Sequence, residues 1–238
     1  MGEVRIALIV MAVVAGLSPA APARAGSAAV ASWSFDTPLA GGGYRDSSGH
    51  GRELAPRARN GGRTGTTARA GGRAVVFPAQ CRGGGCPRVV LEAADSAGLN
   101  PGTAPWRWGA RIALRRSQTG AGENVLQKGF ANGGGQYKLQ VDGTAGRPSC
   151  VVVGTGAGRV HLAAAGVSVA DGGWHAVECR RERASLTVLV DGAVRGRVGI
   201  PAGLAIRNGS PVRLGGKSTV ANNDQFHGAL DDAWIGRG

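Results

Sequence analysis

Aromatic residues and carboxylates are scarce in this chain of 238 residues. Phe, Trp and Tyr make up 5% of the sequence, so few side chains are available to stack on sugar rings. The 15 acidic residues include only six Glu, whereas glycan hydrolysis generally needs two carboxyl groups that flank the scissile bond. Long helical periodicity is also missing, which argues against an all-helical fold.

Long apolar runs are absent except near the N-terminus. There, an apolar run over residues 6–17 follows the basic Arg5, and a small-x-small cleavage pattern ends at Ala25. A membrane anchor needs about 20 apolar residues, and Ser18 interrupts this run too early. We therefore interpret residues 1–25 as a secretory signal peptide that is removed after Ala25. The mature protein is expected to be secreted, soluble and without a membrane span.

Glycine is abundant, at 43 residues, but it shows no collagen-like period. It separates short apolar runs, a pattern typical of β proteins with many turns. About a dozen such runs predict an all-β sandwich of two antiparallel sheets, in a single domain over residues 26–238. The clearest strand has an apolar face and a basic face. Its apolar face holds Trp106, Trp108, Ala110, Ile112 and Leu114, and its basic face holds Arg107, Arg111 and Arg115.

The formal net charge is +13, and it becomes +12 once the signal peptide is removed. Such a charge favours anionic partners such as acidic polysaccharides or cell-wall polymers. The arginines are scattered, however, and only Lys128, Lys138 and Lys217 are lysines, which is typical of a GC-rich coding sequence. Both interpretations stay open, and a nucleic-acid partner is not expected.

A candidate ligand site lies on the predicted strand at residues 106–115. Arg107, Arg111 and Arg115 can present guanidinium groups to sulfate, phosphate or carboxylate. Trp106, at the start of this strand, is the best candidate for an exposed aromatic ring, and most of the other tryptophans are expected in the core. The alternative for the arginines is an ordinary solvated strand face.

Several short motifs follow one another in an order that resembles laminin G-like modules of the concanavalin A-like lectin/glucanase superfamily. Each motif is weak alone, but their order from residue 31 to residue 235 is specific. The motifs are Trp33–Asp36, Asp46–Gly51, Trp106–Leu114, Lys128–Gly129, Trp174–His175, Asp191–Gly192 and Phe226–Asp232.

This resemblance implies a concanavalin A-like jelly roll acting as a secreted binding module for extracellular carbohydrate or a cell-surface polymer. The rival interpretations are a protein-interaction or structural surface domain and a divergent glycoside hydrolase. The Glu-x-Asp-x-(x)-Glu pattern of glucanases is absent. The nearest pair, Glu178 and Glu182, flanks Arg180 and Arg181, which keep carboxylates ionised. We therefore expect no enzymatic activity.

Calcium is the cofactor that the resemblance suggests, in a structural role. Related modules often hold an ion between the first and last strands, where Asp36 and Asp231 are expected to lie, or in edge loops such as the one containing Asp224. The alternative is that Asp231 pairs with an arginine or caps a turn.

Four cysteines in an exported chain favour disulfides over a zinc site, whose ligand spacing is not met. Cys81 and Cys86 bracket a flexible Arg-Gly-Gly-Gly loop that can bring the two sulfurs together. Of three pairings, we expect Cys81–Cys86 and Cys150–Cys179. The second pair is similar to a cross-strand pair of such modules and is expected to tie neighbouring strands.

Overall fold

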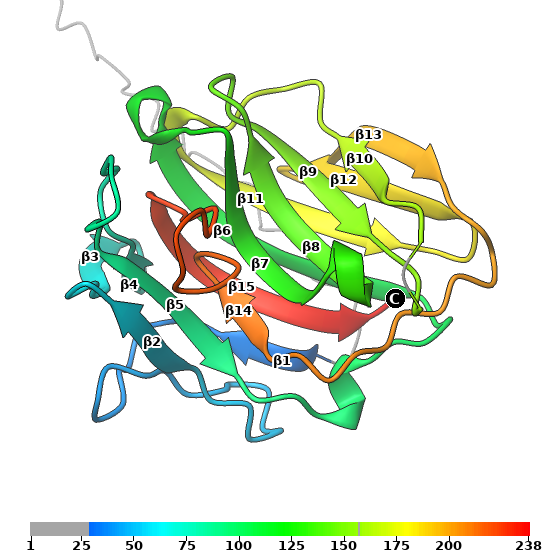
Figure 1. The fold of residues 1–238 in the computed structure, drawn as a ribbon, viewed down its shortest axis with the longest axis horizontal. Coiled ribbons are helices and arrows are strands. Elements are labelled where there is room, and N and C mark those ends of the chain that lie inside the picture. The colour runs from blue at the N-terminus through cyan, green and yellow to red at the C-terminus, as the bar shows by residue number, and fades with distance from the viewer. Residues whose placement is uncertain (1–28, 157) are drawn as a thin grey trace, which may run out of the picture.

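The computed structural model describes residues 29–156 and 158–238, so the expected signal peptide lies outside the described residues. The described chain folds into two antiparallel sheets that pack face to face, which confirms the predicted β-sandwich of the jelly-roll type. Figure 1 looks through both layers, with the green strands β7, β8 and β9 of one sheet lying across the yellow and red strands of the other. Three short 3-10 helices interrupt the strands, at Ala97–Leu99, Arg116–Gln118 and Ala131–Gly133.

The eight-stranded sheet has the order β13-β12-β11-β6-β15-β4-β3, and β1 also pairs with β15. It therefore brings the first and last strands of the described chain together. Its strands are β1 (Ala29–Trp33), β3 (Gly65–Arg69), β4 (Gly72–Val76), β6 (Trp106–Arg115), β11 (Asp171–Arg181), β12 (Ser185–Val190), β13 (Ala193–Gly199) and β15 (Ala229–Arg237).

The seven-stranded sheet has the order β10-β9-β8-β7-β14-β5-β2. Both sheets draw strands from the whole described chain, so neither can form from one half alone. The strands of this sheet are β2 (Ala55–Arg59), β5 (Arg88–Ala93), β7 (Gly122–Phe130), β8 (Gly134–Asp142), β9 (Arg147–Val152), β10 (His161–Ala164) and β14 (Val212–Leu214).

Large aromatic side chains fill the space between the layers. Trp33, Trp106 and Trp108 are almost fully buried. Tyr137 of β8 meets Trp106 edge-on at 6.1 Å between ring centroids and Trp108 at 5.3 Å. The prediction that Trp106 offers an exposed ring was wrong, because its side chain is only 1% exposed. It lies on the same inward face of β6 as Trp108, two residues later, as the period of a strand requires.

Both expected disulfides are present, Cys81–Cys86 and Cys150–Cys179. The second does not tie neighbouring strands, however. Cys150 lies in β9 of the seven-stranded sheet and Cys179 in β11 of the eight-stranded sheet. Both side chains point into the core, so this disulfide joins the two layers through the interior of the sandwich.

The sharp turn between β12 and β13 confirms the hairpin expected at Asp191–Gly192. Asp191 has φ 52° and Gly192 has φ 79°, the left-handed backbone that two-residue hairpins favour and that Gly adopts without a steric penalty. Within the part of the chain that is described, we find no helix with the length and apolarity needed to cross a bilayer.

Candidate functional site

Two partly exposed tryptophans stand on the outer face of the eight-stranded sheet, away from the core. Trp174 of β11 lies opposite Ala113 of β6, and Trp234 of β15 lies opposite Gly109 of β6. Gly109 leaves room for the indole, because a Cβ built there would lie 3.2 Å from Nε1 of Trp234. The sheet thus presents two aromatic side chains on its outer surface, on either side of the central strand β6.

A guanidinium group covers each of these rings. Cζ of Arg69 lies 5.2 Å from the ring centroid of Trp174, and Cζ of Arg107 lies 5.6 Å from that of Trp234. Both distances fall within the range of about 6 Å over which cation–π attraction acts. We call this surface the Trp–Arg face, and it consists of Arg69, Arg107, Arg111, Trp174, Glu178, Asp231, Asp232 and Trp234.

Carboxylates hold the arginines of the Trp–Arg face in place. Nε of Arg107 lies 2.7 Å from Oε1 of Glu178, and Nε of Arg111 lies 3.3 Å from Oδ2 of Asp232. Arg69 pairs with Asp231 and also lies 3.3 Å from Asp232. These pairs orient the guanidinium groups but also neutralise part of their charge.

The residues of this ion-pair network differ in how deeply they are buried. Burial raises the pKa of Asp231, and the adjacent carboxylate of Asp232 adds to that increase, whereas the backbone N–H of Asp232 and the Arg69 guanidinium lower it. Arg111, in contrast, keeps 40% of its side-chain surface exposed. Arg111 is therefore a guanidinium of this face that a ligand can reach.

The structure brings together two of the four predicted ligand-binding residues. Arg107 and Arg111 belong to the Trp–Arg face, and Trp106 lies in the core. Arg115 lies exposed at the end of β6, where its backbone N–H donates to Oε1 of Gln118 at 2.7 Å. It is part of the same strand face, beyond the ion-paired arginines.

The sequence analysis missed Trp174 and Trp234 as surface residues. Trp174 lies three residues before Val177, whose side chain points into the core. Because successive side chains of a strand point to opposite faces, this spacing predicts that Trp174 points away from the core. For Trp234 no such signal exists. A β-bulge between Asp231 and Trp234 reverses the phase of β15, so that Leu230 and Trp234 point to opposite faces.

The three carboxylates expected to bind calcium are not brought together. Oδ1 of Asp36 accepts from the backbone N–H of Arg73 at 2.8 Å, and Asp231 pairs with Arg69. Asp224 lies on the other side of the sandwich, where it pairs with Lys217 at 2.9 Å and binds the backbone of β7. Among residues 29–156 and 158–238 no cluster of His, Cys, Asp or Glu is arranged to hold a metal ion. The residues present do not fit the expected calcium site.

The carboxylates weighed for hydrolysis also have other partners. Glu178 pairs with both Arg107 and Arg180, and Glu182 accepts from the Ser185 hydroxyl at 3.2 Å.

Two of the motif residues support the fold. Lys128 is fully buried, and its Nζ lies 2.7 Å from the carbonyl of Asn208, 3.1 Å from Oδ1 of Asn100 and 2.9 Å from Oδ1 of Asp95. The carboxylate of Asp46 accepts three backbone N–H groups, among them that of Ser32 in β1. These residues therefore fix loops to the sandwich.

A comparison with models of protein families identifies the family of this chain. Residues 104–237 match the family model Laminin_G_3, described as the concanavalin A-like lectin/glucanases superfamily. The chain belongs to this family. The match confirms the resemblance, although its region leaves out the first strands of the structure. A comparison with curated proteins finds no match.

Solved structures of binding domains share the fold. The binding domain of Paraclostridial Mosquitocidal Protein 1 has a TM-score of 0.65 at 12% identity, over 88% of this chain and 48% of that chain. The binding domain of botulinum neurotoxin DC, solved with SialylT, has a TM-score of 0.63 at 10% identity over the same shares. This chain therefore spans about half the length of these toxin domains.

Domain 4 of AbnA, a GH43 extracellular arabinanase from Geobacillus stearothermophilus, was solved in complex with arabinotriose. It has a TM-score of 0.64 at 15% identity, over 89% of this chain and 93% of that domain. At such identities the likeness shows the fold, because one fold hosts many functions. Function has to be argued from the site.

Proposed function

We propose that this laminin G-like chain is a secreted, non-catalytic module that binds extracellular carbohydrate through the Trp–Arg face. The observation that carries the proposal is the pair of partly exposed tryptophans, Trp174 and Trp234, set beside oriented guanidinium groups on one sheet face. Secretion is supported by the two disulfides, which persist in oxidising compartments.

The chemistry of this face suits sugars that carry acidic groups. An indole ring offers a flat apolar surface to the C–H side of a pyranose or furanose ring. Arginine binds carboxylate or sulfate through two parallel N–H groups, and Arg111 is accessible for that role. The net charge of +13 favours the approach of acidic polymers.

A double substitution, Trp174→Ala with Trp234→Ala, tests the proposal on a glycan array that includes acidic and neutral glycans. We expect binding to fall at least about tenfold, since stacked aromatic residues dominate such interfaces. Arg57→Ala is the matched control, because Arg57 is exposed on the opposite sheet and should leave binding unchanged. The absence of reducing-sugar release from the bound glycans would support a non-catalytic role.

Two results would overturn this function. Glycan binding that survives the double substitution would remove the Trp–Arg face from the mechanism. A silent array, together with capture of a purified surface protein that the double variant loses, would favour a protein partner. One structural neighbour, a botulinum neurotoxin DC binding domain solved with rat synaptotagmin II, shows that the fold also occurs in protein complexes.

A further inference from the structure

A hollow of about 200 Å³ lies on the outer face of the eight-stranded sheet, beside the Trp–Arg face. Its floor is apolar and consists of Val76 of β4, Ala229 of β15 and Ala113 of β6, which the strand register places side by side. Ala113 points outward because it alternates with the buried Ile112 and Leu114. The hollow and the Trp–Arg face share no residue.

Glycine residues keep this hollow open. Gly172 has φ 87°, and a Cβ built there would lie 3.3 Å from Cγ of Arg115. A Cβ at Gly228 would lie 2.5 Å from the carbonyl oxygen of Ala113, which is closer than such atoms can approach. Pockets for drug-sized ligands measure about 300–1,000 Å³, so the smaller volume of this hollow suits a single sugar ring.

Arg115 supplies the charge of the hollow. Among the described residues that line the hollow, Arg115 is charged and none is a carboxylate. Within residues 29–156 and 158–238 we find no ion pair of Arg115, whereas the three arginines of the Trp–Arg face are all paired. Asp171 lies opposite Arg115 in the register of β11 and β6, but its carboxylate lies 3.1 Å from Nε2 of His175. The Arg115 guanidinium is therefore open to an anion from solution.

The surroundings of the hollow offer the other groups that a sugar needs. Trp174 lies directly opposite Ala113, and residues in such a position have Cβ atoms about 5 Å apart, so its indole borders the hollow. Thr67 of the exposed strand β3 also lines it, with a hydroxyl that can donate and accept. Gln118 shapes the wall, because its Oε1 accepts from the N–H of Arg115 at 2.7 Å and its Nε2 donates to the carbonyl of His227 at 2.6 Å.

We propose that this hollow binds one sugar residue that carries a carboxylate or a sulfate, with the sugar ring on the apolar floor and the acidic group paired with Arg115. Arginine binds both anions through two parallel N–H groups. A neutral sugar would use the floor and Thr67 alone, so the hollow selects acidic sugars. The inference rests on the proposed function for the choice of a sugar as the ligand, and it assigns the residue that recognises the acidic group.

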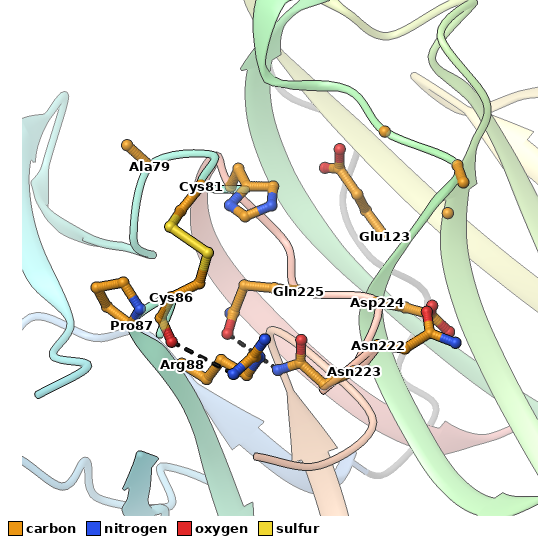
Figure 2. A pocket seen from close by; sticks show the side chains of 14 residues that line it. Ala79, Cys81, Cys86, Pro87, Arg88, Glu123, Asn222, Asn223, Asp224 and Gln225 are labelled. Carbon is orange, nitrogen blue, oxygen red and sulfur yellow. Dashed lines mark hydrogen bonds between the residues drawn. A yellow bond between two sulfur atoms is a disulfide. The ribbon is translucent and has the colours of Figure 1, made fainter. Parts of the chain in front are cut away.

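Another pocket, of about 230 Å³, lies between the Cys81–Cys86 disulfide and Glu123 (Figure 2). Both carboxyl oxygens of Glu123 are buried, so a molecule in this pocket cannot reach them. Burial raises the pKa of Glu123 to about 8, and the backbone N–H groups of Gly120 and His227 lower it in part. Glu123 therefore belongs to the interior of the fold and differs from Arg115, whose side chain is exposed.

The test compares two series of monosaccharides whose members differ in the group at C6. One series is D-galactose, D-galacturonate and D-galactose 6-sulfate, and the other is D-glucose, D-glucuronate and D-glucose 6-sulfate. Each probe is titrated into the mature chain and followed by amide NMR shifts. We expect at least one acidic probe to shift the amides of Ala113, Gly172 and Ala229. Its affinity should exceed that of the neutral sugar of its series at least about tenfold, because the neutral sugar lacks the charged pair with Arg115.

Substitutions of neighbouring arginines test the charge. Arg115→Ala should lower the affinity for the acidic probe at least about tenfold. Arg116→Ala is the matched control, because it removes the same charge one residue later, outside the lining of the hollow, and should change the affinity less than about twofold. Arg115→Lys keeps the charge but loses the two parallel N–H groups, so its affinity should lie between those of Arg115→Ala and the original chain.

A substitution that fills the hollow tests the place of the sugar ring. Ala229→Leu puts a larger side chain on the floor and should weaken binding at least about tenfold. Its side chain points away from the core, so the fold should persist. Ala58→Leu on the exposed strand β2 of the other sheet is the control and should bind as the original chain does. Thermal unfolding of both variants checks that they are folded.

Four results would overturn the inference. These are an absence of shifts with every acidic probe, equal affinity for the acidic and neutral sugars of each series, an Arg115→Ala variant that binds as tightly as the original chain, and an Ala229→Leu variant that does so. Acetate or inorganic sulfate that binds as tightly as the acidic sugars would show a site for simple anions instead.

Failure of the hollow and failure of the proposed function give different results. Trp234 lies opposite Gly109, four residues or about 13 Å along β6 from Ala113. Trp234→Ala should therefore leave monosaccharide binding unchanged. Array binding that the double tryptophan variant loses and Arg115→Ala retains would reject the hollow and keep the proposed function. Binding that survives the double variant but is lost in Arg115→Ala would reject the Trp–Arg face and keep the hollow.

Discussion

At the residue scale, His175 forms a small charge cluster with two aspartates. Its Nδ1 lies 2.8 Å from Oδ2 of Asp191, and its Nε2 lies 3.1 Å from Oδ1 of Asp171. Burial alone would lower the pKa of His175, but the hydrogen bonds and charges of Asp191 and Asp171 outweigh it, so the pKa rises above 6.5. The folded state therefore favours the protonated ring.

This raised pKa predicts a pH-dependent contribution to stability. The contribution should be complete below about pH 6.5, the pKa of His in an unfolded chain, and should be lost as the pH rises through the higher folded pKa. We expect the difference in the free energy of unfolding between the original chain and His175→Asn to shrink between pH 5.5 and pH 8.5. Urea denaturation across this range measures it.

His161 provides the matched control for that experiment. Burial and the nearby Arg159 lower the pKa of His161. The difference in the free energy of unfolding between the original chain and His161→Asn should therefore not shrink between pH 5.5 and pH 8.5. Equal pH profiles for the two variants would contradict the role assigned to the Asp171 and Asp191 carboxylates.

Arg181 offers a second test at the scale of one residue. It points inward from β11 and is fully buried, with its guanidinium donating to the backbone carbonyls of Ala104 and Leu204. Arg181→Met leaves both carbonyls without this partner, and we expect a loss of about 2 to 4 kcal/mol in the free energy of unfolding. Arg180→Met is the control, because the partly exposed ion pair of Arg180 with Glu178 should contribute less than about 1 kcal/mol. Equal losses for the two variants would show that burial does not decide the effect.

At the scale of elements, the two disulfides constrain very different lengths of chain. Cys150–Cys179 closes a loop with a sequence separation of 29 and joins the two sheets, whereas Cys81–Cys86 has a separation of 5. A disulfide that closes a longer loop restricts the unfolded chain more. We therefore expect loss of Cys150–Cys179 to lower the free energy of unfolding by about 3 to 4 kcal/mol, and loss of Cys81–Cys86 to lower it by about 2 kcal/mol. Thermal or urea unfolding of Cys150→Ala/Cys179→Ala and Cys81→Ala/Cys86→Ala checks the order, and a larger loss for the second pair would contradict it.

Two strands of the structure have no alternating apolar pattern in their sequences. β2 (Ala55–Arg59) and β3 (Gly65–Arg69) lie at the edges of the two sheets and are mostly exposed. An edge strand with little buried surface has no need for alternating apolar residues. Its sequence therefore carries little of the period-two signal by which β6 was predicted.

At the scale of the whole molecule, the net charge of +13 predicts a salt-dependent interaction with acidic glycans. The Debye length shortens from about 10 Å at 0.1 M salt to about 3 Å at 1 M salt. We expect affinity for an acidic polysaccharide to fall at least about tenfold over this range, as measured by calorimetry. An affinity that stays the same between the two salt concentrations would contradict a role of the net charge in this interaction.

The sequence by itself determined which side chains of a regular strand face the core of the sandwich and which face solvent. Alternation along β6 places Trp108 and Ile112 inside and Arg107 and Arg111 outside, because a strand turns successive side chains to opposite faces. The tertiary structure decided which distant residues meet: Trp234 on the outer face after a bulge, and Glu123 and the Cys81–Cys86 disulfide on opposite sides of one pocket (Figure 2). The period of a strand specifies a side chain's face but not its neighbours from other strands and loops, and an extra residue in a bulge resets even the face.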